Sequence, residues 1–201
     1  MIAFGDAKAI GRGSEEAIFV RTAKPNITIR ATDGTEIPVG VLSSDAGGAA
    51  LSLTKDRQWT FSGTVAVIEN AQPFWQHEKV LPDVDLAVYA GGNMSKRLVD
   101  WLASNAMSDC QLIHWGDYDP RGVIEYLRLF DRCPSRAISF LPHDIDQLMQ
   151  YGKRSLWENQ SRSLENLRLR TANPHATRML KLFDEHRKGL EQEALLAFCL
   201  E

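Results

Sequence analysis

The sequence predicts an α/β protein whose mostly parallel sheet is flanked by helices. Short apolar, β-branched runs such as residues 64–68 alternate with stretches of helical spacing. This alternation is typical of parallel strands that helices cover on both faces. Two of the apolar runs end in acidic residues, at the edge where such sheets bind their ligands. The first 63 residues look β-rich, and the residues after 142 look helical.

Residues 1–63 are expected to form a β-rich N-terminal subdomain. Its short apolar or alternating runs predict strands over residues 17–22, 26–31, 36–42 and 49–53. Thr32-Asp33-Gly34-Thr35 has the composition of a hairpin turn between the second and third of these strands. Residues 43–50 are expected to form a loop. This part of the chain carries no recognisable chemistry.

Residues 64–142 are expected to form the α/β core of the protein. Apolar runs predict its strands over residues 64–68, 85–90, from 112 to the first aspartate, and 137–141. Helices are expected over 73–80, from the N-cap Ser95 to about residue 106, and over 123–130. Strands separated by helical segments of this length imply right-handed crossovers in a parallel sheet.

Residues 143–201 are expected to form a helical C-terminal extension. Helices are predicted over residues 144–151, within 155–169 and from Pro174 to about residue 198. Pro174 suits the first position of a helix, and Gly189 is expected to interrupt the last one.

The composition indicates a soluble globular protein of 201 residues, with 44% hydrophobic and 24% charged residues. The three cysteines lie far apart without a Cys-x-x-Cys motif, so we expect reduced thiols in a cytoplasmic protein. The N-terminal residues lack the pattern of a signal peptide. No run approaches the roughly 20 apolar residues of a membrane span, so no membrane association is expected.

The charge is unevenly distributed. The formal net charge of −3 argues against a protein that coats nucleic acid by charge alone. Residues 151–188, however, contain nine basic and four acidic residues. A basic segment beside an acidic one suits a metal-dependent enzyme acting on a polyanion, and solvated helix faces would explain it equally well. Under the first interpretation, the phosphate contacts include Arg162, Arg168, Arg170 and Arg178.

Three carboxylates follow two of the predicted parallel strands. Glu69 follows the first apolar run of the core, and Asp117 and Asp119 follow the third. Because the carboxyl ends of parallel strands share one edge of the sheet, the three acids are expected to form one cluster. Closely spaced carboxylates suit Mg²⁺ or Mn²⁺. Asp119 could also cap a helix that starts at Pro120, a role compatible with metal binding.

The motifs around these acids resemble a known family. They are Val67-Ile68-Glu69-Asn70, Ala90-Gly91-Gly92 and His114-Trp115-Gly116-Asp117-Tyr118-Asp119-Pro120-Arg121-Gly122. They resemble the Toprim domain of the nuclease subunit of Wadjet (JetD-like) plasmid-defence systems, a relative of the Spo11 and topoisomerase VI cleavage subunits. Leu190-Glu191-Gln192-Glu193 is similar to a late acidic motif of that family. The resemblance covers roughly residues 64–195, in patches.

The resemblance implies a Toprim-like, Rossmann-like fold and a metal-dependent DNA endonuclease that works with SMC and kleisin-type subunits. Glu69 would be the general acid and base, and together with Asp117 and Asp119 it would hold Mg²⁺ or Mn²⁺. Further candidate metal ligands are Glu191 and Glu193, and Gly91, Gly92 and Arg121 would approach phosphate. Candidate partners are DNA, the SMC-type complex and a second copy of the chain.

The chain departs from the family pattern in two ways. Arg121 stands where many Toprim proteins carry a third acid. No winged-helix domain with a nucleophilic tyrosine is evident, which favours hydrolysis over a covalent protein–DNA intermediate. Two other function classes remain open. One is a Toprim-like binding module without catalysis. The other is a metal-dependent phosphatase or nucleotidyl transferase, which also places Asp-x-Asp after a strand.

Overall fold

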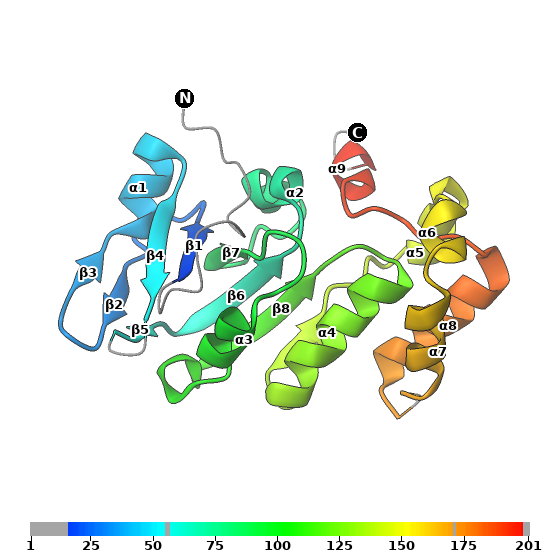
Figure 1. Cartoon of the computed structure of the whole chain (residues 1–201). Coiled ribbons are helices and arrows are strands. Elements are labelled where there is room, and N and C mark those ends of the chain that lie inside the picture. The colour runs from blue at the N-terminus through cyan, green and yellow to red at the C-terminus, as the bar shows by residue number, and fades with distance from the viewer. Residues whose placement is uncertain (1–15, 55–56, 171, 199–201) are drawn as a thin grey trace.

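The computed structural model describes residues 16–54, 57–170 and 172–198 and has a mixed α/β architecture (Figure 1). The main sheet has six strands in the order β4-β1-β7-β6-β8-β9. Their bounds are β1 Glu16–Arg21, β4 Ala49–Leu53, β6 Gly63–Ile68, β7 Leu86–Tyr89, β8 Cys110–Trp115 and β9 Ala137–Ser139. A small second sheet has the order β3-β2-β5, with β2 Ile29–Ala31, β3 Glu36–Ile37 and β5 Trp59–Thr60.

The main sheet is mostly parallel, as predicted. Strands β7, β6, β8 and β9 run parallel to one another, whereas β1 pairs antiparallel with both β7 and β4. Two strands from the first 63 residues therefore extend the same sheet that carries the predicted core. In the register, Val67 of β6 lies between Val88 of β7 and His114 of β8. The carboxyl ends of these three strands thus meet at one edge.

The predicted hairpin turn is confirmed. Strands β2 and β3 pair antiparallel, and Gly34 between them has a φ of 88°. The strand predicted to continue to residue 42, and the loop predicted after it, are wrong, because Val39–Ala46 forms helix α1. Pro38 precedes this helix and lacks the N–H that a strand ladder requires. Gly47, with a φ of 86°, ends the helix in the left-handed conformation.

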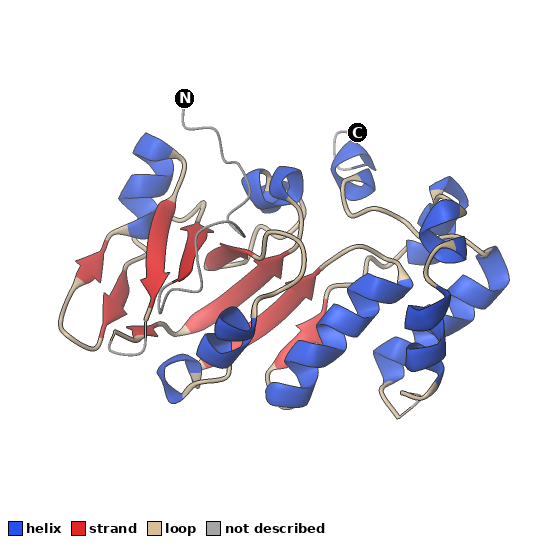
Figure 2. Cartoon of the chain, viewed as in Figure 1, coloured by secondary structure: helices blue, strands red, loops and turns tan. Residues whose placement is uncertain are grey.

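Helices connect the parallel strands and follow the last one. The connecting helices are α2 Ala71–Trp75, η2 His77–Lys79, α3 Lys96–Leu102, η3 Asn105–Met107 and α4 Pro120–Arg132. The C-terminal helices are α5 Ile145–Leu148, η4 Met149–Tyr151, α6 Ser155–Glu158, α7 Ser161–Arg168, α8 Pro174–His186 and α9 Ala194–Phe198. Figure 2 shows that α5, α6, α7 and α8 gather beside the β9 end of the sheet, opposite the small sheet.

Two predicted helix starts are confirmed. Ser95 Oγ accepts a hydrogen bond from Leu98 N at 3.0 Å and caps α3, which ends at Leu102, earlier than predicted. Asn173 caps α8, and Pro174 occupies its first turn. The last predicted helix is interrupted, because α8 ends at His186 and residues 187–193 are not helical. This interruption returns the chain to the edge of the sheet.

The central strand β6 explains the apolar run in the sequence. Its residues 65–68 have no exposed surface. Val65 and Val67 pack into one apolar cluster with residues of α3, while Ala66 and Ile68 pack into another with residues of α4 and α8. Successive side chains of a strand point to opposite faces, so both faces of β6 are covered. The end of this strand is therefore a fixed platform for Glu69.

The structure also bears on the cysteines and on membrane association. Cys110 and Cys133 are buried free thiols, and Cys199 lies outside the described residues. In the part of the chain that the structure describes, no helix is long and apolar enough to cross a membrane.

Replacing Val67 with alanine tests the importance of this platform. The change removes two methyl groups from a fully buried site, so we expect the free energy of unfolding to fall by about 2 kcal/mol. Val41→Ala is the matched control, because Val41 on α1 is 51% exposed and its replacement should change stability by less than about 0.5 kcal/mol. Urea unfolding measures both, and equal decreases would contradict the packing argument.

Candidate active site

Glu69 and Asp117 lie at the carboxyl ends of the neighbouring parallel strands β6 and β8. The backbone of Glu69 continues the ladder, because Glu69 N donates to Trp115 O at 3.1 Å. The Glu69 side chain reaches the loop after β8, since Glu69 Oε2 accepts a hydrogen bond from the backbone N of Asp117 at 3.3 Å. Two acids that are 48 positions apart in the chain are thus brought together at one edge of the sheet.

Asp119 lies at the start of helix α4 and is 4% exposed. Its Oδ1 accepts from Gly122 N at 2.7 Å, which confirms the predicted N-cap. Its Oδ2 accepts from Gln160 Nε2 at 2.6 Å. Both carboxylate oxygens of Asp119 are therefore already engaged within the protein.

The three predicted acids do not form a ready-made metal cluster. Among the described residues, one group has ligand atoms that all lie within 4.8 Å of one another, and it is Asp146, Glu185 and His186. That group is mostly exposed and was not predicted from the sequence. The predicted site instead combines a close pair, Glu69 and Asp117, with a third acid held by α4.

A network of amides surrounds Asp117, and the sequence analysis did not identify it. Asp117 Oδ1 accepts from Gln192 N at 2.9 Å and from Asn70 Nδ2 at 3.2 Å. Asn70 Nδ2 also lies 3.3 Å from Glu193 Oε2, so it bridges the two acids. Gln192 is fully buried, and its Oε1 accepts from Asn70 N at 3.4 Å. Their only signal in the sequence was their position beside the predicted acids.

The structure separates the two late glutamates. Glu193 joins the site through Asn70, whereas Glu191 Oε2 pairs with Lys153 Nζ at 2.6 Å. Of the two predicted additional ligands, only Glu193 is linked by hydrogen bonds to Asp117.

Glycines allow the close approach of these segments. A Cβ at Gly116 would lie 2.8 Å from Glu69 Oε2 and 2.7 Å from His114 Cε1. A Cβ at Gly122 would collide with the carbonyl of Asp117. Gly91 and Gly92 both have positive φ, and Gly92 N donates to Glu69 O at 2.9 Å, which holds the loop after β7 beside the acids.

Asp119 is buried at the acidic site, and Glu69 and Asp117 are half-buried. Burial, followed by the charge of Asp117, raises the pKa of Glu69 from 4.5 to about 7. Burial is also the main reason that the pKa of Asp117 rises to about 6 and that the pKa of Asp119 is raised. Among the described residues, no basic side chain forms an ion pair with any of the three. Buried carboxylates without a partner cation are costly.

This arrangement fits a divalent cation. Asp117 Oδ2 and Glu69 Oε1 have no hydrogen bond from another described residue, so each can act as a ligand. Carboxylate oxygens are the ligands that Mg²⁺ and Mn²⁺ prefer. Asp119 can contribute through a remaining lone pair, because an ionised carboxylate has about four acceptor positions.

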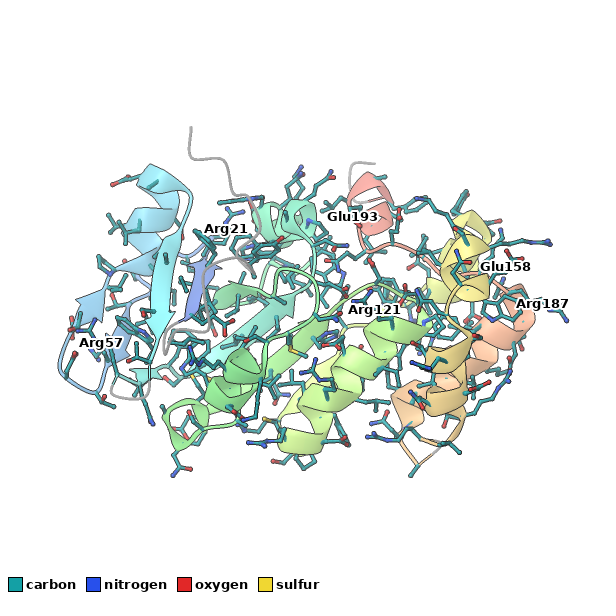
Figure 3. The ribbon with its side chains drawn as sticks, in the orientation of Figure 1. Arg21, Arg57, Arg121, Glu158, Arg187 and Glu193 are labelled. Carbon is teal, nitrogen blue, oxygen red and sulfur yellow. The ribbon has the colours of Figure 1, made fainter. Side chains whose placement is uncertain are left out.

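The predicted phosphate contacts fall into two groups. Arg121 is exposed at the start of α4, where its Nε donates to Asn93 Oδ1 at 3.1 Å (Figure 3). Arg162 is exposed in the first turn of α7, two residues after the Gln160 that binds Asp119. Arg168 lies about 9 Å further along this helix. Arg121 thus follows Asp119 closely in the chain, and Arg162 follows the residue that hydrogen-bonds Asp119.

The other predicted arginines are not gathered at the site. Arg168 pairs with Asp184 at 3.0 Å, and Arg170 pairs with Asp131 at 2.5 Å. Arg178 is exposed on α8, beside His175. The structure therefore favours Arg121 and Arg162 over these three as contacts for a ligand at the acidic site.

A family model described as a domain of unknown function, DUF7281, matches residues 15–201. A comparison with curated proteins finds no match to the chain.

The raised pKa of Glu69 predicts a pH-dependent stability in metal-free buffer. The carboxyl binds its proton more tightly in the folded protein, with a pKa of about 7, than at its ordinary value of 4.5. Its contribution to stability is therefore full below pH 4.5 and is lost as the pH rises through 7. Glu69→Gln removes this dependence. We expect the variant to gain on the order of 1–3 kcal/mol over the wild type between about pH 5 and pH 8.

Urea unfolding in EDTA measures this difference. Glu165→Gln, on the exposed side of α7, is the matched control for removing one negative charge. A difference between Glu69→Gln and wild type that stays constant from about pH 5 to pH 8 would show that Glu69 does not titrate in this range.

Proposed function

The chain belongs to the DUF7281 family, and we propose that it is a Toprim-type, Mg²⁺- or Mn²⁺-dependent DNA endonuclease that hydrolyses phosphodiester bonds. One observation carries this proposal. Glu69 and Asp117 end adjacent parallel strands and share a hydrogen bond, in a buried site without a compensating cation among the described residues. The motifs around them are those that resemble the Toprim nucleases.

Glu69 is the group best suited to move a proton. Its pKa of about 7 lies near neutral pH, where one side chain can both accept and release a proton efficiently. Its Oε2 is fixed by the backbone N–H of Asp117, and its Oε1 has no hydrogen bond from a described residue. The proton would therefore be exchanged at Oε1, with a water or with the leaving oxygen of the DNA strand.

Asp117 would hold the cation, with Asp119 and Glu193 as further ligands. When bound, the cation stabilises the negative charge that develops on the phosphoryl group. The chain's own contribution is to fix the ligand: Gln192 N and Asn70 Nδ2 both donate to Asp117 Oδ1, which leaves Oδ2 for the ion. Arg121, exposed at the start of α4, would contact a phosphate of the bound strand.

The same resemblance supports a role as the nuclease subunit of an SMC-type plasmid-defence complex in the cytoplasm. The partner subunits would then deliver the DNA, which fits a net charge of −3 on this chain. Copurification with SMC and kleisin-type subunits from the source cells tests this part of the proposal separately from the cleavage assay.

A cleavage assay on supercoiled plasmid tests the activity. We expect nicking or linearisation with Mn²⁺ or Mg²⁺, and none in EDTA. Asp117→Asn should abolish cleavage and also the rise in melting temperature on adding Mn²⁺, because it weakens the metal ligand. Glu69→Gln should abolish cleavage but keep much of this stabilisation. Asp184→Asn, on the exposed side of α8, is the matched control and should cut normally.

Each outcome of this assay has a consequence. Cleavage by Asp117→Asn at the wild-type rate would show that the active site has been misassigned. DNA binding without cleavage by the wild type under all metal conditions would favour a non-catalytic binding module instead. Hydrolysis of a simple phosphate monoester without DNA cleavage would favour a phosphatase.

The two groups of arginines predict different salt dependences of DNA binding. Removing one arginine that binds a phosphate should reduce the log–log salt slope by about 0.9. The double variant Arg121→Ala with Arg162→Ala should therefore flatten the slope by up to about 2. Arg168→Ala with Arg170→Ala removes the same charge from residues paired with Asp184 and Asp131, and should leave the slope nearly unchanged. Fluorescence anisotropy over a salt series measures both, and the reverse result would move the DNA surface to the end of α7.

A further inference from the structure

Lys153 is tied to the acidic site through the backbone. Lys153 N donates to Gly189 O at 2.7 Å, and Gly189 N donates to Lys153 O at 3.0 Å. The next residue, Leu190, exchanges two hydrogen bonds of 2.8 and 2.9 Å with Tyr118. Residues 189–190 therefore lie between the other two segments like the middle strand of a small sheet. Neighbouring strands lie about 5 Å apart, and residues 189–190 are the middle one of three. The backbone of Lys153 therefore lies about 10 Å from that of Tyr118.

Two glycines make this close packing possible. A Cβ at Gly189 would lie 2.9 Å from Asp119 Cβ and 2.8 Å from Leu156 Cβ. A Cβ at Gly152 would lie 2.5 Å from the carbonyl oxygen of Gly189. The segment that carries Lys153 is thus packed against residues 189–190, and these residues are packed against the loop that carries Asp119, with no space for a side chain at either contact.

The side chain of Lys153 lies in the field of the acids. Its Nζ is 2.6 Å from Glu191 Oε2, and its pKa is raised first by this hydrogen bond and also by the charges of Glu193 and Asp117. From the sequence, Glu191 and Glu193 were predicted only as candidate metal ligands. The result is a cation at the edge of a site whose buried groups are acidic.

The ion pair between Lys153 and Glu191 can break readily, which allows Lys153 to bind another anion. The two side chains are 59% and 42% exposed, and exposed ion pairs contribute little to stability. A DNA phosphate entering the site would offer Lys153 a full negative charge in place of Glu191. Arg168 and Arg170 are paired in the same way, but their partners Asp184 and Asp131 have no hydrogen bond to the acidic site among the described residues.

We propose that Lys153 binds a phosphate of the DNA strand at the cleavage site, and that Glu191 is its positioning residue and not a metal ligand. This inference rests on the proposed nuclease function. It adds Lys153 to the arginines that were predicted to contact phosphate. It also gives Glu191, which was predicted as a candidate metal ligand, a different role.

Replacing Lys153 with methionine removes the cation and keeps the length of the side chain. We expect DNA binding in EDTA to weaken and single-turnover cleavage with Mn²⁺ to fall about tenfold to a hundredfold. Lys153→Arg should restore part of both. Lys24→Met is the matched control. Lys24 pairs with Asp85 at 2.5 Å, and Asp85 precedes the first residue of β7, at the end of the strand opposite the acidic site. Its replacement should therefore leave cleavage unchanged. Melting temperatures check that each variant is folded.

A chemical change in the DNA identifies the contact. A short duplex is first mapped for its cut site with the wild type, and phosphates around it are then replaced one at a time by neutral methylphosphonates. At the contacted phosphate, the replacement should slow the wild type but cause no further decrease in Lys153→Met. Glu191→Gln should keep the wild-type Mn²⁺ concentration for half-maximal cleavage.

The outcomes separate this inference from the proposed function. If the wild type cuts DNA and Lys153→Met cuts equally well, the inference is wrong and the nuclease assignment stands. If every methylphosphonate slows cleavage by Lys153→Met as much as it slows cleavage by the wild type, Lys153 does not contact any of the replaced phosphates. A Glu191→Gln variant that needs far more Mn²⁺ would return Glu191 to the metal ligands. A wild type that neither binds nor cuts DNA would overturn the proposed function itself.

Discussion

The contact between Glu69 and Asp117 is the constraint on which the rest of this structure depends. Two carboxylates at the ends of adjacent parallel strands repel each other, and burial increases the cost because it removes water from the charges. The surrounding chain compensates with neutral donors. Asn70, Gln192 and the backbone of Asp117 donate hydrogen bonds, but among the described residues no basic side chain pairs with either acid. The fold thus holds the acids in place without neutralising them.

The path of the C-terminal segment follows from this constraint. Helix α8 ends at His186, and Arg187 adopts a φ of 50°, which turns the chain back toward the sheet. The returning residues pair with Tyr118 through Leu190 and place Gln192 and Glu193 beside Asp117. A continuous helix to residue 198 could not make these contacts. The predicted interruption at Gly189 therefore belongs to the construction of the site, since Gly189 also packs against Asp119 without room for a side chain.

The parts that could be predicted from the sequence are those that depend on neighbouring residues. The apolar run of β6, the N-caps at Ser95 and Asp119, and the acids after β6 and β8 are all local patterns. The hydrogen bond between Asn70 and Gln192 joins residues 122 positions apart, and no periodicity indicates it. Helix α1 was missed because an apolar alternation looked like a strand. The arginines were grouped by their density in the sequence, whereas in the structure Arg162 is on α7 near Gln160, Arg168 and Arg170 pair with acids elsewhere, and Arg178 is on α8.

The lack of a basic partner for the acids among the described residues also bears on how the site responds to its substrate. Under the proposed function, the charge that balances the acids comes from outside the folded chain, as a divalent cation at Asp117. The nearby basic groups, Arg121 and Lys153, have polar or acidic partners outside the acid pair, Asn93 and Glu191. Both partners are surface contacts that cost little to break. The protein can therefore hold its acids in a fixed geometry while its cations remain exchangeable, so that binding of the substrate completes the electrostatics of the site.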